Sequence, residues 1–283
     1  MSGGHDRSDS DVQTGHDGLR LAARRVYAII LRHLYVLRRS WPRILELTYW
    51  PTVQMILWGF VTMFFVQNSS WVAQATGVLI SAVLLWDVLF RSNLGVSLSF
   101  MEEMWARNLG QLFVSPLRPI ELAIALTVMS FIRALISVTP AALLALPLFD
   151  VWVFGLGLPL AAFFFNLIIF GWSIGLIVSA LVLRLGLGAE SLAWVAIFAM
   201  APLSGIYYPI ASLPAWLQPI AWALPSSSVF EGMRSVLFGH GFRFDLLASA
   251  LALNAVYLAV AIAIFLFTIR VARERGLLLQ QGE

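Results

Sequence analysis

Six long apolar segments constrain the fold of this 283-residue chain more than any other feature of the sequence. A helix needs about 20 apolar residues to cross a bilayer. Only 12% of the residues are charged, against about 25% in soluble domains, so the chain could not cover a water-facing surface. The sequence therefore predicts an all-α membrane protein whose six transmembrane helices lie near residues 48–66, 75–100, 119–147, 155–183, 190–210 and 245–269.

The arginines predict the orientation of these spans. All 18 basic residues are Arg, and positive charge gathers on the cytoplasmic side of a membrane protein. With the N-terminus inside, only Arg234 and Arg243 fall in outer segments, and only Arg91 and Arg133 fall within spans. The remaining arginines all fall in inner segments, so we expect both termini to be cytoplasmic.

The residues before the first span divide into two parts. Residues 1–18 are polar and rich in Gly, Ser and Asp, which predicts a disordered tail. Residues 19–39 carry arginines on one helical face and apolar residues on the other, which predicts an amphipathic interfacial helix lying on the membrane surface. A cytosolic helix packed on a soluble partner is the alternative. The transmembrane domain then covers 19–275, and residues 276–283 form a cytoplasmic tail.

A charged, Trp-bearing segment, "MEEMWARNLGQLF" at 101–113, joins the second and third predicted spans on the cytoplasmic side. As one short helix it would place Glu103, Arg107 and Gln111 in a polar stripe at i, i+4 spacing. Pro116 would end this helix. Its other side is apolar and holds Met101, Met104, Trp105, Leu109, Leu112 and Phe113. We expect the apolar side to be buried and the polar side to face the cytosol; a solvated loop helix is the alternative.

The long outer segment at 211–244 is rich in Pro, Trp and Ser, and its apolar pieces are too short to span. We expect two short re-entrant helices over 212–238 that dip into the outer leaflet and cap the transport path. Glu231 and Arg234 would satisfy each other one helical turn apart. The expected cap residues are Tyr208, Pro209, Pro214, Trp216, Pro225, Glu231 and Arg234. An ordinary surface loop is the alternative.

Three charged residues, Asp87, Arg91 and Arg133, fall inside predicted spans, where a charge is costly and usually functional. At 1.5 Å per residue, Asp87 and Arg133 both lie roughly 18–20 Å from the inner ends of their spans. An ion pair between them is expected, with Arg91 as the competing partner of Asp87. Such a pair would either hold two helices together or line the translocation path.

The amino acids that are missing exclude several chemistries. There is no Cys, so disulfides and thiolate metal sites are excluded, and the four His residues show no metal-ligand spacing. There is also no Lys, which a P-loop ATPase needs to contact the phosphates of ATP. No His lies in a predicted span, which argues against an intramembrane enzyme. The chain is therefore not predicted to be an enzyme by itself, and no metal or nucleic acid is expected.

Two motifs resemble those of one transporter family. The run "EEMWARNLGQLFVSPLRPIEL" looks like the cytoplasmic segment between spans two and three of ABC-2 type permeases, although Met104 and Trp105 are bulkier than the usual pattern. The stretch from 203 to 239 resembles the second family motif, which follows span five. The matching residues there are Gly205, Tyr208, Pro209, Leu213, Pro214, Pro225 and Arg234.

This resemblance implies a six-span half-transporter of the multidrug or polysaccharide-export type, in the cytoplasmic membrane of a bacterium. Such permeases work as dimers, here expected to be a homodimer, with cytoplasmic ABC ATPase subunits that bind ATP and Mg²⁺. The segment at 101–113 would be the coupling helix that docks on the ATPase. Glu102, Glu103 and Arg107 would meet that partner, and Trp105 and Leu112 would anchor the contact.

We therefore expect a permease subunit that exports an amphipathic, lipid-like or drug-like substrate, or a lipid-linked glycan, driven by ATP hydrolysis on a separate subunit. Membrane lipids are the other expected partners. The alternative is an ion-coupled secondary transporter that uses Asp87 and Arg133. Its expected sequence mark, an internal repeat with paired broken helices, is not visible.

Overall fold

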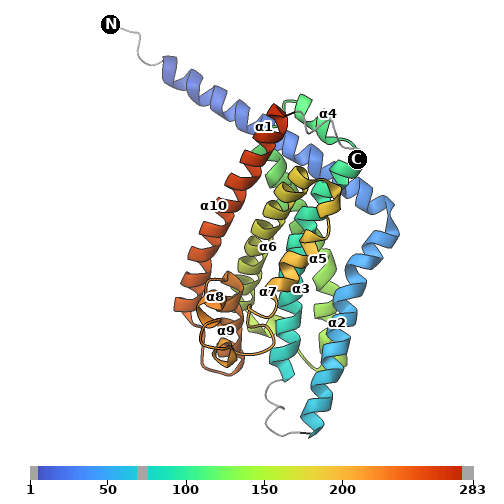
Figure 1. Ribbon diagram of the computed structural model, residues 1–283, viewed down its shortest axis with the longest axis vertical. Coiled ribbons are helices and arrows are strands. Elements are labelled where there is room, and N and C mark those ends of the chain that lie inside the picture. Colours follow the sequence, from blue (N-terminus) through green and yellow to red (C-terminus); the bar gives the residue numbers. More distant parts are fainter. Residues whose placement is uncertain (1–5, 69–75, 276–283) are drawn as a thin grey trace.

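The computed structural model describes residues 6–68 and 76–275, and in this part of the chain all regular structure is helical. Long helices stand side by side in a bundle, and the N-terminal helix lies across one end of it, which we call the α1 end (Figure 1). The helices are α1 (Asp6–Arg39), α2 (Trp41–Asn68), α3 (Thr76–Trp105), α4 (Leu109–Val114), α5 (Pro119–Phe149), α6 (Leu158–Leu185), α7 (Leu192–Met200), α8 (Gln218–Trp222), α9 (Pro225–Leu237) and α10 (Phe244–Glu274). Short 3-10 turns cover Val153–Leu156, Leu187–Ala189 and Ile210–Ser212.

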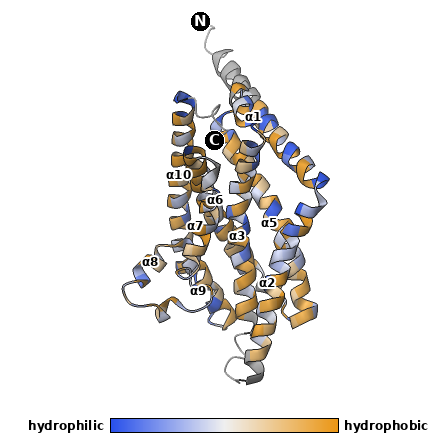
Figure 2. Ribbon diagram, turned by 45° about the vertical axis from the view of Figure 1, so that its right-hand side comes forward, coloured by the Kyte–Doolittle hydropathy of each residue, from blue (hydrophilic) through white to orange (hydrophobic). Residues whose placement is uncertain are grey.

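Four helices of the described chain, α3, α5, α6 and α10, are long and apolar enough to cross a membrane. Helix α2 has 28 residues and sufficient length, but polar residues and Pro51 interrupt its apolar run. Apolar residues cover the bundle helices along their length, whereas α1 is strongly hydrophilic on one side (Figure 2). The chain is a multi-pass membrane protein, and the six-span count remains a prediction.

The fifth predicted span, 190–210, is wrong as a single helix. Helix α7 ends at Met200 after only nine residues, and turns without regular helix follow up to residue 209. Pro202 has no N–H for a helical hydrogen bond, and its ring clashes with the carbonyl four residues earlier. Gly205 then adopts φ of 67°, a left-handed conformation that ends any helical path. The apolar run was long enough to span, but these two residues break it.

The expected amphipathic helix over 19–39 is present as the second half of α1, with Ile29 and Leu37 buried against the bundle. The expected disorder is wrong for residues 6–18. These residues continue α1, because extending an existing helix gains a hydrogen bond for each residue fixed and avoids the cost of nucleation. Residues 1–5 and the predicted tail at 276–283 lie outside the described residues.

Helix α3 is the centre of the bundle, with nearly all of its residues from Ile80 to Met104 buried. It packs between α5 and α6 through small residues. Gly171 and Gly175 of α6 lie against the α3 backbone, and Gly95 of α3 lies against Ser130 of α5. Small residues at such spacing let membrane helices approach closely, where packing rather than hydrophobicity drives their association. The position of α3 between its neighbours fixes the side chains at its end beside α1.

Candidate functional site

The segment at 101–113 is two helices joined by a turn, so the expected single helix is wrong. Helix α3 runs to Trp105 and ends in a Schellman motif: the N–H of Arg107 donates to Met104 O (2.9 Å) and the N–H of Asn108 to Glu103 O (3.0 Å). Arg107 takes the left-handed position, with φ of 50°, where Gly is usual. Glu103, Arg107 and Gln111 therefore do not form one stripe.

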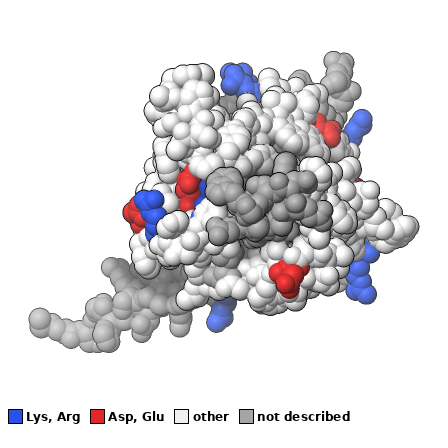
Figure 3. Space-filling model, turned by 90° about the horizontal axis from the view of Figure 1, so that it is seen from below, with Lys and Arg blue, Asp and Glu red and all other residues white. Residues whose placement is uncertain are grey.

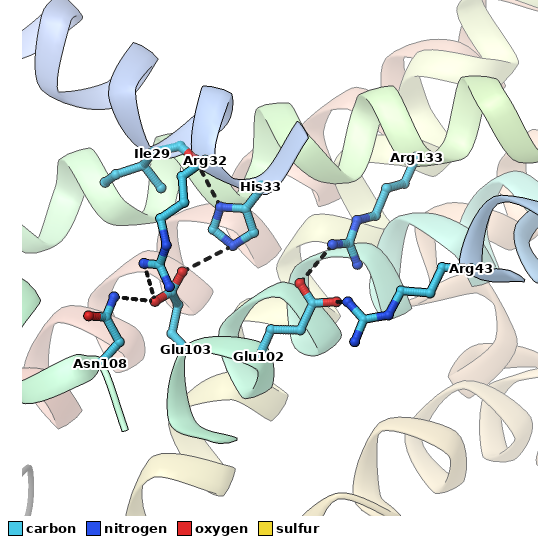
Figure 4. Close-up of polar contacts among 8 residues, drawn as sticks. All are labelled: Ile29, Arg32, His33, Arg43, Glu102, Glu103, Asn108 and Arg133. Atoms are coloured by element: carbon cyan, nitrogen blue, oxygen red, sulfur yellow. Dashed lines mark hydrogen bonds and ion pairs between the residues drawn. The ribbon is translucent and has the colours of Figure 1, made fainter. Parts of the chain in front are cut away.

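Glu103 faces the bundle and not the cytosol, contrary to expectation. Its side chain is 2% exposed, and its Oε2 accepts hydrogen bonds from Arg32 of α1 and Asn108, both at 2.7 Å (Figure 4). His33 is also buried, and its Nδ1 donates to Ile29 O, since a carbonyl can only accept. Its Nε2 lies 3.3 Å from Glu103 Oε1. Glu103 therefore fastens α1 and the turn after α3 to each other.

Glu102 bridges two other helices. Its carboxylate accepts hydrogen bonds from Arg133 of α5 at 2.8 Å and from Arg43 of α2 at 3.0 Å (Figure 4). The expected pair between Asp87 and Arg133 is therefore wrong. Side chains on a helix lean toward its N-terminus, so Arg133 leans toward the α1 end while Asp87, on the antiparallel α3, leans away from it. Similar depth along the two helices does not bring those two charges together.

A third carboxylate, Glu121 in the first turn of α5, also binds α1. Arg25 donates to its two oxygens at 2.8 and 2.5 Å, and this hydrogen-bonded pairing raises the pKa of the Arg25 guanidinium. This pair was not predicted, although the sequence shows both an arginine stripe on α1 and an acidic residue at the start of a span. Together Glu102, Glu103 and Glu121 tie α1, α2, α3 and α5 into one joint, which we call the carboxylate joint.

The exposed part of the segment at 101–113 and its continuation to Val114 follows Glu102 and Glu103 in the chain. Arg107 and Gln111 are exposed, and Val114 is almost fully so. Leu112 instead packs against the core, and Trp105 is half-exposed at the mouth of a cavity. The charges expected to meet a partner are thus divided: Arg107 is accessible, Glu103 is not, and Glu102 is mostly covered.

Asp87 and Arg91 are buried one turn apart on α3. Neither carboxylate oxygen of Asp87 has a hydrogen-bond partner among the described residues. Arg91 lines a cavity of about 530 Å³ that is bordered by the start of α2, the C-terminal half of α3, α5, α7 and the end of α1. We call it the arginine cavity. Its lining residues are Leu37, Arg43, Glu46, Leu47, Trp50, Gln54, Phe90, Arg91, Leu94, Leu98, Glu102, Trp105, Arg133, Trp194 and Phe198.

At the opposite end of the bundle, α8 and α9 are the two short helices expected within 212–238. The expected ion pair is present, with Arg234 Nη2 3.1 Å from Glu231 Oε1. The pair also holds the preceding loop, because Arg234 donates to Gly205 O at 2.5 Å and Glu231 accepts from Ile210 N at 2.7 Å.

The other residues expected in the cap lie in and around this loop. Tyr208 donates to Pro202 O. Pro209 and Pro214 flank the 3-10 turn between them, Pro225 begins α9, and Trp216 is exposed. Entry of these helices into a membrane leaflet stays a prediction.

Replacing Arg234 by Met should release the loop at 205–210 and lower the free energy of unfolding by about 1–3 kcal/mol, because the buried Gly205 carbonyl and the partly buried Glu231 carboxylate lose a charged donor. Arg243→Met is the matched control. Its ion pair with Asp245 is half-exposed on both sides, so it should cost at most about 1 kcal/mol. Thermal unfolding of both purified variants in detergent would measure the difference. Equal losses would show that Arg234 does not hold this loop.

Residues 27–238 match the family model described as ABC-2 type transporter. A search of curated proteins found no match to the chain.

Proposed function

Because the chain belongs to the ABC-2 type transporter family, we propose that it is the permease subunit of an ATP-driven exporter. It moves an amphipathic, lipid-like or drug-like substrate, or a lipid-linked glycan, out across the cytoplasmic membrane of a bacterium. The observation that carries this proposal is the segment from Arg107 to Val114, which presents an exposed surface at the α1 end while its base is tied into the carboxylate joint.

This segment is suited to pass on a push from a second protein. The turn at Arg107 and helix α4 meet the ATPase, while Glu103 connects the end of α3 to α1. Asn108, in the turn itself, binds the same carboxylate at 2.7 Å. A displacement of α4 therefore reaches α1 through Glu103, and α2 and α5 through the neighbouring Glu102. ATP and Mg²⁺ bind the partner subunit, since this chain has no Lys for the phosphates.

The distribution of charge supports an orientation with the α1 end in the cytoplasm. That end carries the arginines of α1, whereas the described part of the opposite face is mostly uncharged, with single charged side chains scattered over it (Figure 3). Both termini are then cytoplasmic. We propose a homodimer of this subunit, with lipids around its apolar outer surface. The exposed aromatic residues of α2, among them Tyr49 and Phe60, suit an interface with a second copy or with lipid.

The double change Arg107→Ala and Gln111→Ala should weaken binding of the ATPase about tenfold, which corresponds to about 1.4 kcal/mol. Both side chains are exposed, so insertion and folding should be unaffected. Co-purification with an ABC ATPase from the same genome, followed by a titrated binding measurement, would test this. Arg38→Ala with Arg39→Ala is the control, because these exposed residues lie at the end of α1 and outside the coupling segment.

Unchanged ATPase binding and transport-linked ATP hydrolysis in the coupling variant would contradict the role of α4. If the α1 control weakens ATPase binding equally, the contact depends on the overall positive charge of the α1 end and not on α4 in particular. If no ATPase co-purifies with the wild-type protein, the permease assignment itself fails.

One observation favours a second function, an ion-coupled secondary transporter. The Asp87 carboxylate is fully buried and has no partner among the described residues, as a proton-carrying group in a membrane would be. In this case Arg133 is not its partner, because it is bound to Glu102. Transport that persists with a hydrolysis-deficient ATPase and stops on addition of a protonophore would favour this function.

A further inference from the structure

The arginine cavity contains two buried guanidinium groups, those of Arg91 and Arg133, which differ in whether a carboxylate binds them. Arg91 is 7% exposed and Arg133 6%, and the Nε of each lacks a hydrogen-bond partner. Arg133 donates to Glu102 at 2.8 Å. Arg91 makes no hydrogen bond or ion pair with any described residue; its guanidinium carbon lies 5.5 Å from the centre of the Phe90 ring. Five donors of a permanently charged group are thus left without a protein acceptor.

Leaving a buried charge without partners costs several kcal/mol, so the arrangement is costly unless something else occupies the cavity. The charged groups facing Arg91 are Glu46 on α2 and Asp87 on its own helix, and neither is within hydrogen-bond distance of it. Arg43, Glu102 and Arg133 form a closed bridge with one positive charge in excess. The lining charges, Arg43, Arg91 and Arg133 against Glu46 and Glu102, sum to one net positive charge.

The rest of the lining is apolar and aromatic. Trp50, Trp194 and Phe198 are each about half-exposed at the rim, where α2 and α7 border the cavity, and Phe90 lies beside Arg91. Phe90 and Trp194 contact each other edge to face, with ring centres 5.4 Å apart. A molecule entering from the side would meet aromatic rings first and the Arg91 guanidinium deeper in.

We propose that the arginine cavity binds the anionic head of an amphipathic molecule, a phosphate or carboxylate held by Arg91, with its apolar part against the aromatic rim. A planar guanidinium binds such oxygens through two parallel hydrogen bonds. It therefore suits an anionic head better than the ammonium group of a Lys does. The inference rests on the proposed permease function and narrows its substrate class to anionic amphiphiles. The same head chemistry occurs in exported cargo and in membrane phospholipid, so the test separates these two sources.

The test uses the full-length chain with its ATPase in nanodiscs of zwitterionic lipid, and lysophosphatidic acid as the anionic probe. Dodecyltrimethylammonium carries a positive head and is the charge-reversed probe. We expect saturable binding of lysophosphatidic acid and at least tenfold weaker binding by Arg91→Gln. Arg91→Lys should recover part of the affinity, since it keeps the charge and loses the paired geometry. Arg184→Gln, an exposed arginine at the end of α6, should bind as the wild type does.

Three outcomes decide the proposal. Stimulation of ATP hydrolysis by lysophosphatidic acid that is lost in Arg91→Gln supports an anionic cargo. Binding that depends on Arg91 without any stimulation overturns the cargo assignment and identifies a resident phospholipid as the occupant. Equal binding by wild type and Arg91→Gln, or preference for dodecyltrimethylammonium, overturns the site. Failure of the permease function is separate, because it would appear as absence of the ATPase from the purified complex.

Discussion

Replacing Glu102 by Ala should lower the free energy of unfolding by about 3–5 kcal/mol, because it strands the buried Arg133 guanidinium without a partner. Arg133 is the critical group because its Nε already has no acceptor, so loss of the 2.8 Å contact to Glu102 leaves the whole side chain unpaired. Denaturant unfolding of the purified protein in detergent micelles, followed by circular dichroism, would measure the loss.

The other members of this bridge give the controls. Arg43→Ala should cost only about 0–1 kcal/mol, since its side chain is 45% exposed and Glu102 keeps Arg133. The double variant Glu102→Ala with Arg133→Ala should be more stable than Glu102→Ala alone, because no charge is then stranded. A double variant no more stable than Glu102→Ala would show that the cost lies elsewhere in α3.

Replacing Gly171 by Leu should prevent the α6–α3 packing and reduce the yield of folded protein to near zero. A Cβ at this position would lie 2.5 Å from Ser92 Cβ, 2.8 Å from Leu89 O and 3.0 Å from Asn93 N. Two of these are backbone atoms of α3, which cannot rotate away. The smaller change Gly171→Ala should cost about 1–3 kcal/mol by overpacking. Expression followed by size-exclusion chromatography would measure both effects.

Gly188 supplies the comparison, because a Cβ there would meet no atom within 4 Å. Gly188→Leu should therefore yield folded protein at close to the wild-type level. Similar losses at Gly171 and Gly188 would indicate that side-chain size alone reduces insertion, and that the close approach of α3 and α6 is not the cause.

The parts of the fold that depend on apolar length were predictable from the sequence. Helices α3, α5, α6 and α10 coincide with predicted spans because length and hydropathy decide whether a helix can cross a membrane. The predicted fifth span failed for a local reason. Pro202 and Gly205 each break the helix at a single backbone position. The length and hydropathy of the whole run do not reveal such a break.

The site was harder to predict, because it depends on directions and not on positions along the chain. Glu231 and Arg234 were predictable as a pair since they lie one turn apart on a single helix. By contrast, each of the three carboxylates of the joint, Glu102, Glu103 and Glu121, binds an arginine that is more than thirty residues away in the sequence. Their partners follow only once the antiparallel helices and the lean of each side chain are known. The turn at Arg107 was missed because an Arg occupies a position where Gly is the usual signal.

The carboxylate joint has a consequence for where the molecule can bend. A shift of α3 along its axis by one residue, about 1.5 Å, would pull Glu103 and Glu102 out of contact with α1, α2 and α5 together. We therefore expect these four helix ends to move together as one rigid body. At the opposite end, between Ala201 and Pro209, irregular backbone replaces helix and Gly205 takes a left-handed conformation. This stretch carries no charged residue, and Arg234 and Tyr208 hold it through hydrogen bonds to the Gly205 and Pro202 carbonyls. We therefore expect hinge motion in that stretch and not at the carboxylate joint, because hinges are short irregular segments whose φ and ψ angles can change.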